Sequence, residues 1–277
     1  MQLALPTSPK MGPSDSDAHN GAIAFERLKV LEHSTLNHSM KKLRNVLVVG
    51  ASSGIGEAIA LAFAKEGDQV TATGATEAEV KAARERQYSK VNFVQLDVRD
   101  GQAVTELISQ LGDLDVLVNC AGVIRRGQEH EPDVFEQVVD INLVGAMRVC
   151  SAARDGLAKT GGCIINTASM LSFFGGGLVP AYSASKGGIA QLTKSLAIAY
   201  AEQGIRVNAI APGWIATPLT QALQDDPQRS APIIARTPLK RWGVPDDLIG
   251  PVMFLASPQA KFVTGVVLPV DGGYLIS

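Results

Sequence analysis

The stretch NVLVVGASSGIGEAIALAFAKEG, residues 45–67, decides the fold. It opens with a short β-branched run, typical of a strand buried on both faces, and continues with apolar residues at helical spacing. Gly50, Gly54 and Gly56 lie at the junction. Glycines there permit a tight turn and a close backbone approach to a ligand, while the helix N-terminus favours a diphosphate. An ordinary tight turn is the alternative, but a strand before and a helix after favour a nucleotide site.

The alternation of strand and helix patterns repeats along the chain. Further strands are expected over 69–73, 91–98, 115–122, 162–169 and 206–212, with helices between them, the two longest over 132–157 and 181–203. Repeated βα units joined by short loops predict a parallel sheet with helices on both faces. The expected fold class is therefore α/β, a single doubly wound domain of the Rossmann type over residues 42–277.

Residues 1–41 have a different composition, with clusters of Pro, Ser, Asp and Asn and no signal-peptide layout. We expect an N-terminal appendage. Ile23, Leu28 and Leu31 stand near helical spacing, so a short docking helix is one interpretation. A flexible tail, or a misplaced start codon ahead of Met40, is equally compatible with the sequence.

Charge and cysteine content narrow the classes of partner. The chain has 25 Lys and Arg against 27 Asp and Glu, a net charge of -2, which gives no electrostatic reason to bind nucleic acid or an anionic membrane. It also has no apolar run of the roughly 20 residues that a membrane helix needs. Cys120, Cys150 and Cys163 show no disulfide or zinc spacing, which indicates core residues in a reducing compartment. We therefore expect a soluble, cytoplasmic protein with no metal site.

The segment YSASK places Tyr182 and Lys186 four residues apart in a predicted helix, so both side chains lie on one face. A cation near a phenol favours the phenolate and lowers its pKa from about 10, which makes Tyr182 a usable general acid or base. Ser169, at the end of a predicted strand, is placed to hydrogen-bond the same substrate oxygen. A core tyrosine with a surface lysine is the alternative interpretation.

The segment NCAG, Asn119 to Gly122, ends the predicted fourth strand. In a doubly wound sheet, the first and fourth strands flank the point where strand order reverses, and ligands bind there. Two loops of small residues facing one crevice fit a dinucleotide. A plain strand end is the alternative.

Together these motifs resemble the short-chain dehydrogenase/reductase family, in its 3-oxoacyl-carrier-protein reductase-like or sugar and polyol dehydrogenase-like branch. The resemblance rests on GASSGIG, Asp97 in LDV, NCAG, Asn142 in DINLVG, Ser169, YSASK, APGWIATPL and the terminal VVLPVDGG. It runs from about Lys42 to the end of the chain. Only Cys120 departs from the pattern, since many members have a second Asn there.

The resemblance implies a catalytic set and a hydride transfer between NAD(P)(H) and a secondary alcohol or ketone. Tyr182 would exchange a proton with the substrate oxygen that Ser169 holds. Lys186 would lower the pKa of Tyr182 and bind the nicotinamide ribose. Asn142 would anchor a water that links Lys186 to solvent, and a helix-bending hydrogen bond is its simpler alternative. A non-catalytic NAD(P)-binding protein of the same fold remains the alternative function.

The resemblance also implies which residues border the cofactor. The diphosphate loop would comprise Gly50, Ser52, Ser53, Gly54, Ile55 and Gly56. Asp97 and Val98 would contact adenine, and Asn119, Ala121 and Gly122 would border the ribose and phosphates. Pro212, Gly213, Ile215 and Thr217 would close over the nicotinamide beside Tyr182 and Lys186.

Residues at the end of the second predicted strand bear on whether the protein prefers NAD or NADP. Gly74 stands where an NAD-preferring site would have a carboxylate on the adenosine ribose, so no charge there repels the extra phosphate of NADP. Ser53 and Ala75 stand where a cation would attract it. Hydroxyls of Ser52, Thr73 and Thr76 could bind a phosphate, while Glu77 or Glu79 could bind a bare ribose. The sequence slightly favours NADP(H), with dual use open.

The substrate class stays open at this point, among acyl thioesters, polyols, deoxy-sugar acids and steroid-like alcohols. Segment 220–243 is expected to form a mobile lid that selects among them. The helices over 132–157 and 181–203 carry more apolar surface than one sheet face covers, which together with the resemblance predicts a homotetramer.

Overall fold

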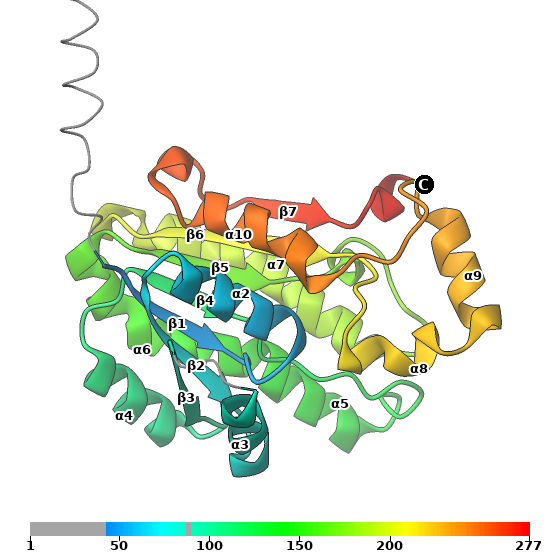
Figure 1. Ribbon diagram of the computed structural model, residues 1–277, viewed down its shortest axis with the longest axis horizontal. Coiled ribbons are helices and arrows are strands. Elements are labelled where there is room, and N and C mark those ends of the chain that lie inside the picture. Colours follow the sequence, from blue (N-terminus) through cyan, green and yellow to red (C-terminus); the bar gives the residue numbers. More distant parts are fainter. Residues whose placement is uncertain (1–42, 87–89) are drawn as a thin grey trace, which may run out of the picture. The chain divides into compact units, whose positions relative to one another are not determined.

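The computed structural model describes residues 43–86 and 90–277. The predicted appendage, residues 1–41, lies outside the described residues, so the division of the chain there stays a prediction. Within the described part, seven parallel strands form one sheet in the order β3-β2-β1-β4-β5-β6-β7 (Figure 1). They are β1 (Asn45–Val49), β2 (Gln69–Gly74), β3 (Val91–Gln95), β4 (Val116–Asn119), β5 (Cys163–Thr167), β6 (Arg206–Pro212) and β7 (Val267–Val270). The predicted parallel α/β sheet is confirmed.

Helices cover both faces of this sheet, as the sequence predicted. On one face lie α2 (Gly54–Lys65), α3 (Glu77–Glu85) and α10 (Ile249–Leu255), and on the other lie α4 (Gly101–Leu111), α6 (Gly145–Thr160) and α7 (Pro180–Tyr200). Successive side chains of a strand point to opposite faces. Val46 and Val48 of β1 accordingly join the core under α2, whereas Leu47 and Val49 join the core under α4 and α6.

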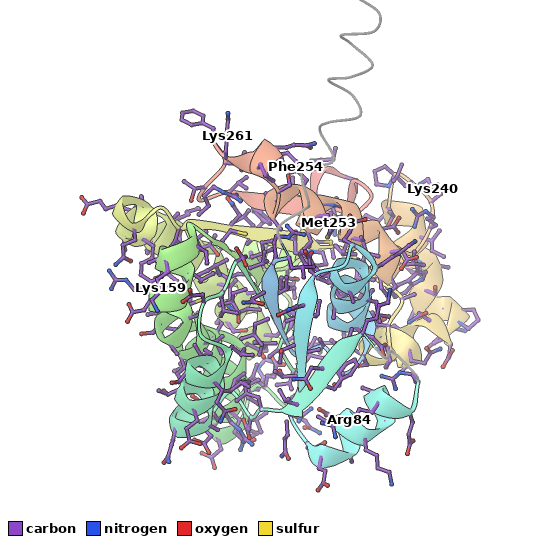
Figure 2. All side chains as sticks on the ribbon, turned by 60° about the vertical axis from the view of Figure 1, so that its left-hand side comes forward. Arg84, Lys159, Lys240, Met253, Phe254 and Lys261 are labelled. Carbon is purple, nitrogen blue, oxygen red and sulfur yellow. The ribbon has the colours of Figure 1, made fainter. Side chains whose placement is uncertain are left out.

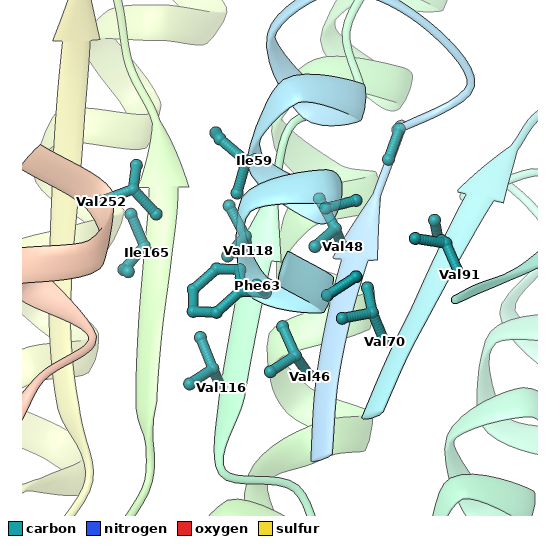
Figure 3. Close-up of a cluster of buried hydrophobic side chains, with 14 of the residues drawn as sticks. Val46, Val48, Ile59, Phe63, Val70, Val91, Val116, Val118, Ile165 and Val252 are labelled. Atoms are coloured by element: carbon teal, nitrogen blue, oxygen red, sulfur yellow. The ribbon is translucent and has the colours of Figure 1, made fainter. Parts of the chain in front are cut away.

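Two contacts illustrate how the helices are fixed to the sheet. Arg84 of α3 donates a hydrogen bond to the carbonyl of Phe93 in β3, at the edge of the sheet (Figure 2). Phe63 of α2 is fully buried among valines of β1 and β4, including Val46 and Val116 (Figure 3). Each helix is therefore held to the sheet by a side chain that contacts its strands.

The structure differs from the sequence prediction in two elements. The predicted helix over 132–157 is α5 (Pro132–Val139), a π-helical stretch (Asp140–Val144) and α6 in succession. Strand β7, which pairs with β6, was not predicted as a strand. Its sequence VLPV is short and contains Pro269, which is compatible only with an edge strand or strand end.

The chain diverges after β1 and β4, neighbours in the sheet whose connections lead to opposite faces. Gly50 follows β1 with φ of +75°, a conformation that glycine adopts without strain. A Cβ atom at Gly50 would lie 2.5 Å from the Cα of Ala121 in the loop after β4. The two loops thus touch at their start, and the crevice that the topology creates opens beyond this contact.

This contact predicts the effect of two glycine substitutions. Gly50→Ala should lower the free energy of unfolding by about 1–3 kcal/mol more than Gly67→Ala, because overpacking adds to the backbone strain that both variants share. Gly67 is the matched control, since its φ is +92° and nothing lies within 4 Å of its added Cβ. Urea denaturation measures the difference. Equal losses would contradict the close approach of the two loops.

Candidate active site

Four side chains singled out in the sequence converge at the carboxyl end of β5. Ser169 follows β5 and begins a short 3-10 turn, and Tyr182 and Lys186 lie in the first two turns of α7. Asn142 comes from the π-helical stretch on the neighbouring connection. A Cβ atom at Gly122 would lie 3.4 Å from Asn142 Oδ1 and 3.7 Å from Lys186 Nζ. Both polar groups therefore reach the loop after β4.

A cavity of about 130 Å³ joins this group to the predicted nucleotide loops. Ser169, Tyr182 and Lys186 line it. It is also lined by Ile55, Gly122, Pro212, Gly213, Ile215 and Thr217. The structure therefore gathers residues from five parts of the chain around one space, although their roles toward a cofactor stay predictions.

Tyr182 is half-buried and lines the same cavity as Ser169. Burial raises the pKa of the Tyr182 hydroxyl above its usual value, the nearby Ser169 hydroxyl opposes that rise, and the carboxylate of Glu129 adds to it. With a raised pKa the Tyr182 hydroxyl is protonated at neutral pH. It is therefore suited to donating its proton to a substrate oxygen.

Lys186 is 4% exposed, and its Nζ donates a 2.6 Å hydrogen bond to the carbonyl oxygen of Thr167 at the end of β5. Burial disfavours the ammonium form and lowers the pKa of Lys186 to about 8. The group therefore exchanges its proton near physiological pH.

The expectation that Lys186 lowers the pKa of Tyr182 is not met in this structure. Lys186 Nζ lies 5.5 Å from the centre of the Tyr182 ring and is directed to Thr167. Desolvation of the phenol is the largest cause acting on the Tyr182 hydroxyl, so its pKa is raised rather than lowered.

Asn142 is buried and bonds the loop after β4. Its Oδ1 accepts from the N–H of Val123 (2.8 Å), and its Nδ2 donates to the Val123 carbonyl (2.9 Å) and to Ser185 Oγ (3.2 Å). π-Helical turns inside α-helices are frequent at functional sites. The Asn142 side chain bonds the loop after β4 and helix α7 and not its own helix, so the helix-bending hydrogen bond is not seen, and the water relay stays a prediction.

Two residues that position α7 were missed in the sequence. Glu129 is 1% exposed, and its carboxylate accepts hydrogen bonds from the N–H groups of Arg125 and Tyr182, both at 2.8 Å. A carboxylate at a helix N-terminus is favourable. Ser172 donates a 2.6 Å bond to the carbonyl of Lys186. Neither belongs to a spaced motif, and Glu129 in GQEHEP resembles an ordinary surface acid, so only the tertiary contact identifies them.

The glycine loop fits a diphosphate. Ser53 precedes α2 in an extended conformation, and its side chain does not cap the helix, so the N–H groups of the first turn are left for a ligand. A Cβ atom at Gly56 would meet the Gly50 carbonyl oxygen and lie 2.9 Å from Ala51 Cα. The helix therefore starts against the strand end, with its N-terminus at the crevice.

At the other end of the crevice, several side chains already have partners. Asp97 pairs with Arg99, whose hydrogen bond lowers the pKa of the Asp97 carboxyl, while Val98 packs beneath Gly145.

Side chains at the end of β2 also have partners. Glu79 Oε2 accepts from the N–H groups of Ala75 and Thr76, and Thr76 in turn caps α3. Thr73 Oγ1 accepts from the N–H of Gly50. Gly74 ends β2 beside Ser52, its Cβ position 3.0 Å from Ser52 Cβ.

Asn119 differs from its expected position, because its side chain turns into the core rather than toward the crevice. Its Nδ2 donates to Asn166 Oδ1 (2.9 Å) and to Cys150 Sγ (3.2 Å), and the residue is 5% exposed. Only its backbone would be available to a nucleotide, and that contact stays a prediction. The side chain instead ties β4 to β5 and α6.

The expected lid contains α8 (Gln221–Gln224) and α9 (Pro227–Arg236). Arg236 of α9 lies over the rings of Tyr274 (4.2 Å) and Phe174 (5.5 Å). Its Nε also donates to the carbonyl of Ser277. The segment is thus attached to the C-terminal residues and to the loop after β5, and its mobility stays a prediction.

Within residues 43–86 and 90–277, no group of three His, Cys, Asp or Glu side chains is placed to hold a metal ion. No helix in the same residues combines the length and apolar character needed to cross a membrane.

Known proteins are similar to this chain in both sequence and fold. A family model described as enoyl-(acyl carrier protein) reductase matches residues 50–275. The 2-dehydro-3-deoxy-D-gluconate 5-dehydrogenase of Pseudoalteromonas atlantica is 42% identical over an alignment of 246 residues, and the match covers 83% of this chain and 94% of that protein.

Two solved structures are similar to this one. A putative NAD(P)-dependent gluconate 5-dehydrogenase from Beutenbergia cavernae, with bound NADP at low occupancy, has 40% identity and a TM-score of 0.79, covering 84% of this chain and 97% of that one. A gluconate 5-dehydrogenase from Burkholderia cenocepacia, in complex with NADP and tartrate, has 34% identity and a TM-score of 0.79, covering 84% and 96%.

The motifs, the sheet topology and these similarities agree, and the chain belongs to the short-chain dehydrogenase/reductase family of NAD(P)-dependent oxidoreductases.

Proposed function

We propose that this enzyme interconverts a secondary hydroxyl and a ketone on a sugar acid, using NADP(H) in preference to NAD(H). The observation that carries the proposal is the single cavity that Ser169, Tyr182 and Lys186 line together with the loops predicted to hold the nicotinamide. The similar dehydrogenases of 2-dehydro-3-deoxy-D-gluconate and gluconate support the substrate class, and the bound NADP in similar structures supports the cofactor.

The cofactor fits the residues present. The uncapped N-terminus of α2 would hold the diphosphate, and Gly122 leaves room beside Asn142 and Lys186 that a side chain would fill. The nicotinamide, when bound, accepts or gives the hydride, which no side chain can supply. Lys186 would hold the nicotinamide ribose, since its Nζ borders the same cavity.

Tyr182 and Ser169 would act on the substrate oxygen. Ser169 binds that oxygen, and Tyr182 gives it a proton during ketone reduction or takes one during alcohol oxidation. Glu129 and Ser172 hold Tyr182 and Lys186 in position by forming hydrogen bonds with the backbone of α7. They are positioning residues, because they touch neither reacting atom.

The loop after β4 offers positive charge for a substrate carboxylate. Arg125 and Arg126 are exposed and follow Gly122, which lines the cavity, by three and four positions. The loop is held in place, because Arg125 donates its N–H to Glu129, and Gly127 donates its N–H to the Leu178 carbonyl. Guanidinium groups bind carboxylates through paired hydrogen bonds.

The alternatives are reduction of an acyl thioester and a non-catalytic binding role. The description of the matching family model favours the first. The second is disfavoured by the similarity to proteins named as dehydrogenases and by Ser169, Tyr182 and Lys186, which line one cavity.

A homotetramer remains part of the proposal. Phe135 of α5 is 36% exposed, and Val144 and Met147 on the helix that continues from it are exposed to a similar extent. Exposed apolar side chains on two successive helices are typical of a face that pairs with a second copy. The cytoplasmic location expected from the unpaired cysteines stays a prediction.

The role of Tyr182 predicts the outcome of Tyr182→Phe. Turnover of 2-dehydro-3-deoxy-D-gluconate with NADP⁺ should fall at least about 100-fold, since the proton-transferring group is lost. NADP⁺ binding, measured by calorimetry, should stay within about threefold. Tyr200→Phe, the same change on the same helix but outside the cavity, should leave turnover nearly unchanged. Full activity of Tyr182→Phe would rule out the assigned role.

The buried ammonium predicts a pH dependence of stability. The pKa of Lys186 is about 8 in the folded state and near 10.4 when unfolded, so the unfolded chain binds more protons between these values. Stability due to Lys186 therefore rises as pH increases. The free energy of unfolding of the wild type, minus that of Lys186→Met, should increase by about 2 kcal/mol from pH ~7 to ~9.5.

Urea denaturation of both proteins measures this difference, and contributions from the buried cysteines largely cancel in the subtraction. If the difference between the two free energies of unfolding stays constant or falls as pH increases, burial does not disfavour the Lys186 ammonium.

The substrate proposal predicts the effect of replacing both loop arginines. Arg125→Gln combined with Arg126→Gln should raise the KM for the sugar acid by about 10–100-fold, because a charged hydrogen-bonded partner is lost. The kcat should change less than about threefold. Arg154→Gln, which removes a cation on α6 that pairs with Gln203, is the control. Equal losses with an uncharged polyol would contradict carboxylate binding.

A further inference from the structure

We infer that Arg86, at the C-terminal end of α3, binds the adenosine 2′-phosphate and so determines the preference for NADP(H). This inference rests on the proposed use of NADP(H). The sequence offered no cation at either expected position, since Ser53 and Ala75 are uncharged. In the structure a cation reaches the glycine loop from the end of α3, where Arg86 lies.

Arg86 lies against the glycine loop. Its Nη2 donates a hydrogen bond to the carbonyl of Ser52, and its Nε donates to Glu57 Oε1 at 2.8 Å. Glu57 belongs to the first turn of α2, two helical positions from Ile55 at the crevice. The end of α3 is thereby joined to the loop that follows β1.

The same loop touches the end of β2, where NAD and NADP are told apart. Ser52 is the neighbour that a Cβ atom at Gly74 would meet, at 3.0 Å. Arg86 therefore bonds the backbone of a residue that borders the ribose-reading position. Ser52 precedes Ser53 in the chain, and Gly74 precedes Ala75, so this guanidinium bonds a residue next to both expected positions of a cation.

The position of Arg86 is fixed by its helix. α3 is nine residues long and begins with a capping box of Thr76 and Glu79 just after β2. Arg84 in its last turn donates to the Phe93 carbonyl of β3 (Figure 2). With both ends attached to the sheet, Arg86 is directed back over the loop after β1.

Nearby acidic side chains are already engaged. Glu79 caps the backbone of Ala75 and Thr76, and Glu57 is paired with Arg86 at 2.7 Å. Glu57 orients the guanidinium, which has five N–H donors, more than its two partners use. The Arg86 side chain is 40% exposed. It therefore keeps donors and surface for a phosphate.

There is room for the phosphate beside this guanidinium. Arg86, Glu57, Ser53 and Gly54 line a cavity of about 700 Å³ that runs along the outer face of α2. Ser53 adds a hydroxyl group to the lining of this cavity. An arginine fork with neighbouring hydroxyls is a chemically suitable site for a phosphate dianion, whereas a bare ribose hydroxyl gains little from it.

Ligand binding tests this inference without relying on turnover. Calorimetry with 2′,5′-ADP and with 5′-AMP compares the two adenosine halves directly. Arg86→Gln should weaken 2′,5′-ADP at least about tenfold and leave 5′-AMP within about twofold. Lys81→Gln, which removes another exposed cation from α3, should change neither by more than about twofold. Equal weakening of both ligands, or of neither, by Arg86→Gln would overturn the inference.

A second variant covers a loss of folding in Arg86→Gln. Arg86→Lys keeps the charge but not the fork, so it should bind 2′,5′-ADP with intermediate affinity. If correctly folded Arg86→Lys weakens 2′,5′-ADP and 5′-AMP equally, the loss is not specific to the 2′-phosphate and the inference fails. Wild-type protein that binds 5′-AMP as tightly as 2′,5′-ADP would instead refute the proposed NADP preference. Wild-type selectivity that survives in Arg86→Gln would refute only the role of Arg86.

Discussion

The site is organised around a buried ammonium. Lys186 is 4% exposed, and a charge in that position needs a hydrogen-bond acceptor in the protein. The Thr167 carbonyl at the end of β5 provides one, which fixes where α7 must lie against the sheet. Glu129 and Ser172 bond the backbone of the same helix and hold it there. Tyr182, one turn earlier, is thereby carried to Ser169.

The sheet topology supplies the space in front of this group. Because β1 and β4 are neighbours and the chain leaves them toward opposite faces, the loops after them part beyond the contact of Gly50 with Ala121. One loop presents the N-terminus of α2, and the other presents Gly122 against Asn142 and Lys186. A dinucleotide that spans the crevice would therefore have its phosphates at a helix N-terminus and its nicotinamide beside Tyr182.

Much of this arrangement could be predicted from the sequence, for physical reasons. A β-branched run followed by glycines and by apolar residues at helical spacing predicts a strand, a turn and a helix, so β1 and α2 could be predicted. Residues four apart share a helical face, so the pairing of Tyr182 with Lys186 could be predicted too. Strand β7 was not, because VLPV is short and contains proline. Glu129, Ser172 and Arg86 act through contacts between segments distant in sequence. The pKa of Tyr182 depends on burial, which spacing does not reveal.

The central claim is that Tyr182 and its partners serve a direct hydride transfer. It is tested by reducing the keto form of the sugar acid with NADPH deuterated at either face of nicotinamide C4, followed by mass spectrometry of the product. One of the two labelled cofactors should deliver deuterium to the new carbinol carbon, and the other should not. A product that is formed without deuterium from both labelled cofactors would contradict the claim.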